Sequence, residues 1–286
     1  MNIGIIGLGV IGGSFGRAFR KKTGHIVYGY DISSDTMLKA DMLSALHHPL
    51  SEADYPLLDV LIIALNPRAF RETLTATAGK LKNGAIVIDI GGNKKCPVLA
   101  MRAAAEQYPN IHFIATHPMA GREFYGIKHA IPSLFEGAST LMIPVAADIN
   151  ARSVMKNLLL EAGFANVILT EENEHDGIIA YTSQLAHIIS SAYVNNPKAD
   201  VHDGFSAGSF RDLTRVAKMN TSMWTELVSD NRENILRELD IFRENVNAFY
   251  RAIESKDEAA LQSLFEKGNA KKEAVEKATR EWKKNN

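Results

Sequence analysis

The sequence predicts an α/β fold in which an N-terminal, doubly wound parallel sheet is followed by an all-helical C-terminal domain. In the first half of the chain, short apolar runs alternate with helical patterns, as they do in β-α-β units around a parallel sheet. From about Glu171 onward, strand-like runs cease and apolar residues recur at helical spacing. A chain of 286 residues is long enough for two cores. We therefore expect one domain at residues 1–170 and a second at residues 171–286.

The candidate strands of the first domain are apolar throughout and rich in β-branched residues, as expected for strands that are buried on both faces. They are Ile3–Ile6, His25–Tyr30, Val60–Leu65, Ala85–Ile90, Ile111–Ala115, Ser139–Val145 and Ala165–Thr170. The second domain is expected to open with a helix that starts near Asp176 and runs through Ile189.

A later segment carries an apolar stripe at alternating steps of four and three residues, which predicts a helix with one strongly apolar face. The stripe consists of Ile235, Leu239, Phe242, Val246, Phe249 and Ile253. An ordinary core-facing helix and a dimer seam both fit this pattern. The length of the stripe favours a homodimer that forms through the helical domain.

Composition limits the classes of partner. Hydrophobic residues make up 46% of the chain and charged residues 23%, which is typical of a globular protein. The net charge is -1 and the pI is about 6.8, so we expect neither nucleic acid nor an anionic membrane as a partner. The single cysteine, Cys96, suggests neither a disulfide framework nor a metal cluster. With no signal-peptide pattern at Met1, the sequence favours a cytoplasmic enzyme with a small-molecule substrate.

Three glycines, Gly7, Gly9 and Gly12, form a G-x-G-x-x-G pattern between an apolar strand and a helical pattern. The pattern provides a tight turn, room for a pyrophosphate beside the backbone, and close contact between helix and strand. Val10 and Ile11 lie within it, where the N-terminus of the helix offers free N–H groups to an anion. A tight turn without a ligand is the alternative. The pattern indicates a Rossmann-type domain and a nicotinamide cofactor.

Asp31 closes the second candidate strand, nineteen residues after Gly12. Its carboxylate can accept both hydroxyls of an adenosine ribose, and it would repel a ribose phosphate. No arginine follows in Ile32–Ser34 to hold such a phosphate, so NAD is favoured over NADP. A plain helix cap is the other interpretation of Asp31. Residues after later strands, Asn66–Pro67 and Gly91–Gly92, are expected to line the nicotinamide end.

His117 stands at the carboxyl end of the strand that finishes near Ala115. An imidazole there is well placed to remove a proton from an alcohol as hydride leaves its carbon, so His117 is the candidate base. His187 lies one turn after Ser183 on a predicted helix and is a second candidate, whereas His175 with Asp176 is interpreted as a polar helix start. The remaining histidines are given no role: His25, His47, His48, His112, His129 and His202.

Arg215 ends a segment that begins at Gly208. It can pair with Asp212 at helical spacing, or it can offer a bidentate fork to a carboxylate of the substrate. The spacing leaves both interpretations open.

Together these motifs resemble the prephenate and arogenate dehydrogenases of tyrosine biosynthesis. The matching pieces are GLGVIGGS, DIGGNKK, THPMAGRE, HDGIIAYTSQLAH and GSFRDLTRVA followed by MW, in this order through about Leu227. The resemblance implies a prephenate dehydrogenase, in which NAD oxidises the ring alcohol of prephenate while the ring carboxylate is lost, giving 4-hydroxyphenylpyruvate. Arogenate is the alternative substrate, and an acidic residue near its amino group would favour it.

The resemblance also implies roles for individual residues. His117 accepts a hydrogen bond or proton from the ring hydroxyl, Arg215 binds a substrate carboxylate, and His187 helps to bind the substrate. Further substrate-binding positions are Glu123, Ser183 and Trp224.

Two positions depart from the family pattern. Gly92 stands where members commonly carry a serine that is hydrogen-bonded to the catalytic histidine, and Gln184 stands where many have a first histidine. Asn93 or water is the expected substitute for the missing hydroxyl.

Two other functions compete with this interpretation. The first is a β-hydroxyacid dehydrogenase or pyrroline-carboxylate reductase with a helical second domain. The second, suggested by Gly92, is an NAD-binding regulatory protein with a decayed active site.

Overall fold

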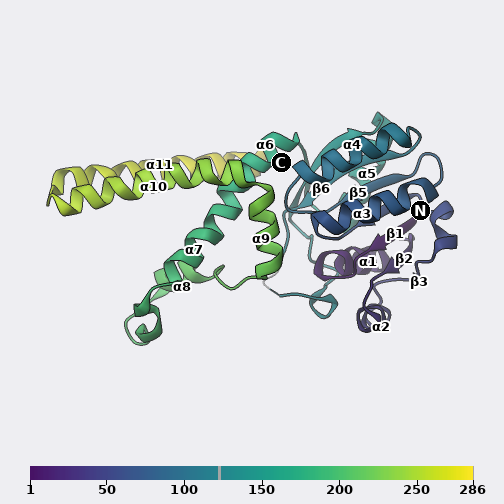
Figure 1. Ribbon diagram of the computed structural model, residues 1–286, viewed down its shortest axis with the longest axis horizontal. Helices are drawn as coiled ribbons and strands as arrows, with labels where there is room; N and C mark the ends of the chain where they lie inside the picture. The colour runs from purple at the N-terminus through teal and green to yellow at the C-terminus, as the bar shows by residue number, and fades with distance from the viewer. Residues whose placement is uncertain (122–123, 286) are drawn as a thin grey trace. The chain divides into compact units, whose positions relative to one another are not determined.

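The computed structural model describes residues 1–121 and 124–285, and its strands form one eight-stranded sheet (Figure 1). The strand order is β3-β2-β1-β4-β5-β6-β7-β8, which contains the 3-2-1-4-5-6 order of a Rossmann fold. The strands are β1 (Asn2–Ile6), β2 (Ile26–Tyr30), β3 (His48–Pro49), β4 (Val60–Ile63), β5 (Ile86–Asp89), β6 (His112–Pro118), β7 (Ser139–Ala146) and β8 (Asn166–Leu169).

All seven candidate strands form, with ends shifted by a few residues, and the two-residue β3 was not predicted. The predicted parallel sheet is confirmed, with one exception: β7 runs antiparallel to β6. A parallel connection requires a crossover, usually a helix. In the described part of residues 119–138 the only helical turn is η3 (Ile127–His129), and the chain returns alongside β6 instead.

Helices cover both faces of the sheet, and alternate strand residues point to opposite sides. Ile62, Ile88 and Ile114 pack with the apolar faces of α1 and α5, whereas Val87 and Phe113 pack with α3 and α4. The long helices of this part are α1 (Val10–Lys22), α2 (Ser34–Met42), α3 (Pro67–Thr77), α4 (Lys95–Gln107) and α5 (Ile149–Ala162). Because β1, β4, β5 and β6 are neighbouring parallel strands, their carboxyl ends lie along the same edge of the sheet.

A helical segment follows β8 and belongs to the same compact unit, Met1–Asn231. The helix expected from Asp176 through Ile189 forms, but a π-helical turn interrupts it. Its helices are α6 (Glu172–Ile179), the π turn η4 (Ala180–Leu185), α7 (Ala186–Val194), α8 (Gly208–Thr214) and α9 (Thr221–Asp230). π turns within α-helices occur frequently at functional sites.

The second unit, Arg232–Asn286, contains a helical hairpin of α10 (Arg232–Glu254) and α11 (Glu258–Asn285). The predicted stripe lies on α10, and Phe249 meets Phe265 of α11 with ring centroids 5.3 Å apart. Several apolar side chains of the hairpin remain exposed: Leu236, Ile241, Phe242, Val246, Tyr250, Ile253, Phe265, Val275 and Trp282.

No helix within the described ranges is long and apolar enough to cross a membrane.

Candidate active site

The loop after β1 has the geometry that the three glycines predict. Gly7 adopts a φ of +90°, and a Cβ there would lie 2.5 Å from the carbonyl oxygen of Ala64. A Cβ on Gly12 would lie 2.0 Å from the carbonyl oxygen of Gly7, so this position also requires glycine. A Cβ on Gly9 would meet nothing within 4 Å. The open space at Gly9 is where a pyrophosphate could approach the backbone.

The N-terminus of α1 has no side-chain cap: Gly9 is its N-cap, and Val10 and Ile11 are its first residues. Asp31 directly follows β2. Its carboxylate accepts the N–H of Leu8 in the β1 loop at 2.9 Å and the N–H of Ser33 at 3.0 Å. Ser33, not Asp31, is the N-cap of α2. A carboxylate has about four acceptor sites, so Asp31 keeps capacity for ribose hydroxyls.

The loops after β4 and β5 lie at the same edge of the sheet. Asn66 is the N-cap of α3 and accepts the N–H of Ala69 at 3.1 Å. Gly91 donates its N–H to the carboxylate of Asp89 at 2.9 Å. Both residues therefore shape loops at the edge where the sequence places the nicotinamide.

A buried ion pair supports the β5 loop. Lys94 and Asp89 are only 1% and 2% exposed, and Lys94 Nζ lies 2.5 Å from Asp89 Oδ2. The ammonium also donates to the carbonyl of Thr116 at 2.6 Å, and the other oxygen of Asp89 accepts the N–H of Thr116 at 3.0 Å. Burial lowers the pKa of Lys94, and the charge and hydrogen bond of Asp89 oppose that shift. The pair thus places a cation beside the end of β6.

His117 lies at that end of β6 and forms a chain with two residues of α6. Its Nδ1 lies 2.9 Å from Nε2 of His175, and Nδ1 of His175 lies 2.7 Å from Oδ1 of Asp176. Asp176 also accepts the N–H groups of Lys94 at 2.8 Å and Lys95 at 2.9 Å, at the N-terminus of α4. The sequence suggested that His175 and Asp176 form the polar start of a helix. Asp176 does cap a helix, but that helix is α4 rather than α6, to which Asp176 belongs.

The environment of His117 disfavours its cation. Burial is the main cause that lowers the pKa of His117 well below the usual value, and the charge of Lys94 and the presence of His175 lower it further. At neutral pH the imidazole of His117 is consequently neutral and able to accept a proton.

A network of buried amides joins the β5 loop to the helical segment. Gln184 of the π turn donates to Oδ1 of Asn93 at 2.7 Å, and Asn93 donates to the carbonyl of Leu227 at 2.7 Å. Asn231 donates to Oε1 of Gln184 at 2.7 Å and to the carbonyl of Asp176 at 2.8 Å. Asn93 was one expected substitute for the missing serine as hydrogen-bond partner of His117. Its side-chain amide instead bonds to Gln184 and Leu227. The residue that contacts His117 is His175.

A second group of predicted residues consists of His187, Trp224 and Arg215. The ring of His187 stacks on Trp224 with centroids 3.8 Å apart, and its Nδ1 lies 2.9 Å from the carbonyl oxygen of Ser183. Burial lowers the pKa of His187; the hydrogen bond to Ser183 opposes this, and the charge of Arg215 adds to the lowering. Asp212 lies 3.6 Å from Nε of Arg211.

Several cavities lie in this unit. His187 and Trp224 line one of about 530 Å³ between α7 and α9, which also includes Ser191, Asn195 and Thr221. None of the described residues that line it is Asp or Glu.

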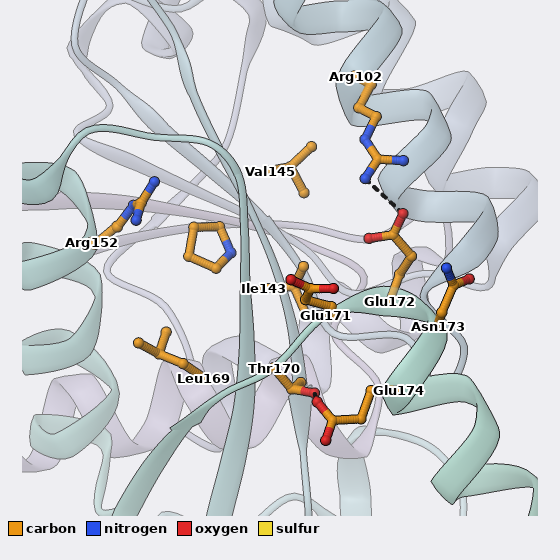
Figure 2. A pocket seen from close by; sticks show the side chains of 11 residues that line it. Arg102, Ile143, Val145, Arg152, Leu169, Thr170, Glu171, Glu172, Asn173 and Glu174 are labelled. Atoms are coloured by element: carbon orange, nitrogen blue, oxygen red, sulfur yellow. Dashed lines mark hydrogen bonds and ion pairs between the residues drawn. The ribbon is translucent and has the colours of Figure 1, made fainter.

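Figure 2 shows another cavity, of about 660 Å³, beside β7, β8 and the start of α6. There Arg102 points toward Glu172, with 2.6 Å between Nη2 and Oε1, and the hydroxyl of Thr170 donates to Glu174 at 2.7 Å (Figure 2). Of the predicted site residues that the structure describes, none lines this cavity.

The structure thus brings His187, Trp224 and Arg215 together and pairs His117 with His175, while Glu123 lies outside the described residues. Sequence reasoning missed Lys94 and Asn231, and it did not give His175 and Asn93 the contacts that they make. The local signal for His175, Lys94 and Asn93 was their position inside the DIGGNKK and HDGIIAYTSQLAH motifs, whereas Asn231 lies outside both.

The strand order, the glycine loop and a neutral histidine at the carboxyl edge define a dinucleotide-binding oxidoreductase of Rossmann type. Residues 15–169 match the family model described as prephenate dehydrogenase, nucleotide-binding domain, and residues 171–267 match prephenate dehydrogenase, dimerization domain. The chain belongs to the prephenate dehydrogenase family.

Individual relatives agree with this membership. A prephenate dehydrogenase of Lactococcus lactis is 29% identical over 76% of this chain, which spans 61% of that relative's length. A cyclohexadienyl dehydrogenase of Zymomonas mobilis is 29% identical over 92% of both chains. The crystal structure of a prephenate dehydrogenase from Aquifex aeolicus, in complex with hydroxyphenyl propionate and NAD+, has a TM-score of 0.85 and 26% identity, covering 96% of this chain and 98% of that one.

The buried ion pair leads to a stability prediction. Replacing Lys94 by Met leaves the carboxylate of Asp89 buried without its cation, which should lower the free energy of unfolding by about 3 to 5 kcal/mol. The double variant Lys94→Met/Asp89→Asn should recover at least half of this loss, because an amide needs no counter-ion. Urea unfolding of the three proteins measures both values.

The matched control is the exposed pair of Lys39 and Asp35, also 2.5 Å apart. Lys39→Met should cost less than about 1 kcal/mol, since exposed ion pairs contribute little. Equal losses in Lys94→Met and Lys39→Met would contradict the stabilising role of the buried pair.

Proposed function

We propose that this protein is a prephenate dehydrogenase that uses NAD to convert prephenate into 4-hydroxyphenylpyruvate. The observation that carries the proposal is the placement of His117 at the carboxyl edge of a Rossmann sheet, in the same compact unit as His187, Trp224 and Arg215. Membership of the prephenate dehydrogenase family supports the choice of reaction.

The residues of the β1 loop fit NAD. The open space at Gly9 admits the pyrophosphate, and the uncapped N-terminus of α1 offers it the N–H groups near Val10, Ile11 and Gly12. Asp31 accepts the ribose hydroxyls, which favours NAD over NADP. Asn66 and Gly91 line the nicotinamide end. When bound, NAD accepts the hydride from the ring carbon.

His117 acts as the general base that accepts the proton of the ring hydroxyl. Its neutral ring accepts the hydroxyl proton while hydride leaves the same carbon, which turns the alcohol into a carbonyl. The bond to the ring carboxylate then breaks, carbon dioxide leaves, and the electron pair moves through the ring to the carbonyl oxygen. His117 can return the proton to that oxygen, which completes the phenol.

Arg215, His187 and Trp224 bind the substrate, together with Ser183 and Glu123. The guanidinium of Arg215 holds a carboxylate and orients the ring. None of the described residues that line the cavity beside His187 and Trp224 is acidic, and the proposed substrate-binding residue Glu123 lies outside the described residues. The choice of prephenate over arogenate therefore rests on the resemblance to the family.

We also propose a homodimer, with residues 1–170 as the NAD-binding domain and residues 171–286 as the substrate-binding and dimerisation domain. The exposed apolar side chains of α10 and α11 support it, because large exposed apolar patches mark interaction sites. A cytoplasmic location stays a prediction from the sequence.

The first test compares substrates. NADH formation with prephenate should exceed that with arogenate, and His117→Asn should lower kcat with prephenate by a factor of about 10² to 10⁴, because the proton acceptor is lost. Affinity for NAD should be unchanged. NAD binding without turnover of either substrate would instead support a regulatory protein, and a preference for arogenate would reverse the substrate assignment.

The second test is the pH dependence of kcat/KM. An ordinary histidine titrates at about pH 6.5, whereas the pKa of His117 is lowered by burial and by Lys94. Because the base must be neutral, kcat/KM should stay constant as the pH falls to about 6.5 and should decline only well below it. Half-loss of activity near pH 6.5 would contradict this assignment.

The third test concerns the dimer. Val246→Asp places a charge in the exposed apolar face of α10 and should convert the dimer to monomers in analytical ultracentrifugation. Asn245→Asp adds the same charge at a neighbouring exposed polar position and should leave the dimer intact. A monomeric wild-type protein would refute the proposal.

A further inference from the structure

The two hydrogen bonds of His175 determine which nitrogen of His117 carries a hydrogen. Asp176 accepts backbone N–H groups through both of its oxygens, so its carboxylate acts as an acceptor. Nδ1 of His175, 2.7 Å from that carboxylate, therefore carries a hydrogen. In a neutral imidazole the other nitrogen, Nε2, is then an acceptor.

The acceptor nitrogen of His175 in turn assigns the hydrogen of His117. Nε2 of His175 lies 2.9 Å from Nδ1 of His117, so Nδ1 of His117 must be the donor. This leaves Nε2 of His117 without a hydrogen and therefore basic.

We infer that His175 is a positioning residue of the proposed dehydrogenase: it holds His117 in the tautomer whose Nε2 can take the proton of the substrate hydroxyl. His175 suits this task because it is 1% exposed and is held at its far side by Asp176, which is fixed in turn on the N-terminus of α4. A third group that orients a catalytic imidazole is a general requirement for such a base.

The same contacts bear on the charge that appears on His117 during the reaction. Burial, Lys94 and His175 all disfavour a cation on His117. Asp89 is engaged with Lys94 and with Thr116. Once protonated, His117 still donates from Nδ1 to His175, so proton uptake requires no rearrangement of the chain.

A spectroscopic test does not depend on the substrate. Long-range proton–nitrogen correlation spectra of isotope-labelled histidine distinguish the two neutral tautomers, and His117→Asn identifies the signals of His117 among the nine histidines. The wild-type protein should show His117 with hydrogen on Nδ1. His175→Leu should shift it to the Nε2-protonated form or to a mixture. Finding hydrogen on Nε2 of His117 in the wild type would overturn the inference.

The kinetic test rests on the proposed function. His175→Leu should lower kcat with prephenate on the order of 10²-fold while KM changes little, because the base is misplaced but the substrate contacts remain. His175→Gln should restore much of the loss, since its amide oxygen can accept from Nδ1 of His117. An unchanged kcat in a folded His175→Leu protein would refute the positioning role.

A matched control separates this role from general effects of removing a histidine. His112 begins the same strand β6 and lies 3.9 Å from Asp148, so His112→Leu removes another histidine that has an acidic neighbour. It should leave both the His117 spectrum and kcat unchanged. If the tautomer follows the prediction but wild-type protein fails to oxidise prephenate, the proposed function is wrong and the positioning by His175 stands.

Discussion

Asp176 extends from α6 to the N-terminus of α4, where its two oxygens accept the N–H groups of Lys94 and Lys95. The first N–H groups of a helix lack partners within the helix and carry the positive end of its dipole, so a buried carboxylate is well stabilised there. Glu226 of α9 binds the start of α3 in the same way, accepting the N–H of Arg68 at 3.0 Å. Two carboxylates of the helical segment thus fix it against two helices of the sheet.

This constraint sets the position of His175 and, through it, the contact with His117. His175 precedes Asp176 in the chain, so fixing Asp176 also fixes the ring that meets His117 at the end of β6. The buried amides of Gln184 and Asn231 have hydrogen-bond partners in this arrangement. An unpaired buried polar group costs about 1 to 3 kcal/mol, so any sliding of the helical segment along the sheet would be penalised at several atoms at once.

Features of the fold that depend on residues close together in the sequence could be predicted, whereas features that depend on distant residues could not. The apolar strand patterns and the glycines Gly7 and Gly12 act within a few residues, and they gave the strands and the β1 loop correctly. The direction of β7 could not be predicted, because no strand pattern distinguishes a crossover from a return along the same edge. The role of His175 depends on a partner 58 residues away, and chain spacing gave no indication of that contact.

At Gly92 the sequence departs from the family pattern, and the long-range contact between His117 and His175 changes how this departure is interpreted. From the sequence, the missing serine suggested a decayed site. A Cβ on Gly92 would lie 3.5 Å from Leu227, an ordinary van der Waals distance, so the neighbouring residues do not force glycine at this position. The hydrogen-bonding need of His117 at Nδ1 is already met by His175. The absence of a hydroxyl at position 92 therefore gives no reason to regard the site as decayed.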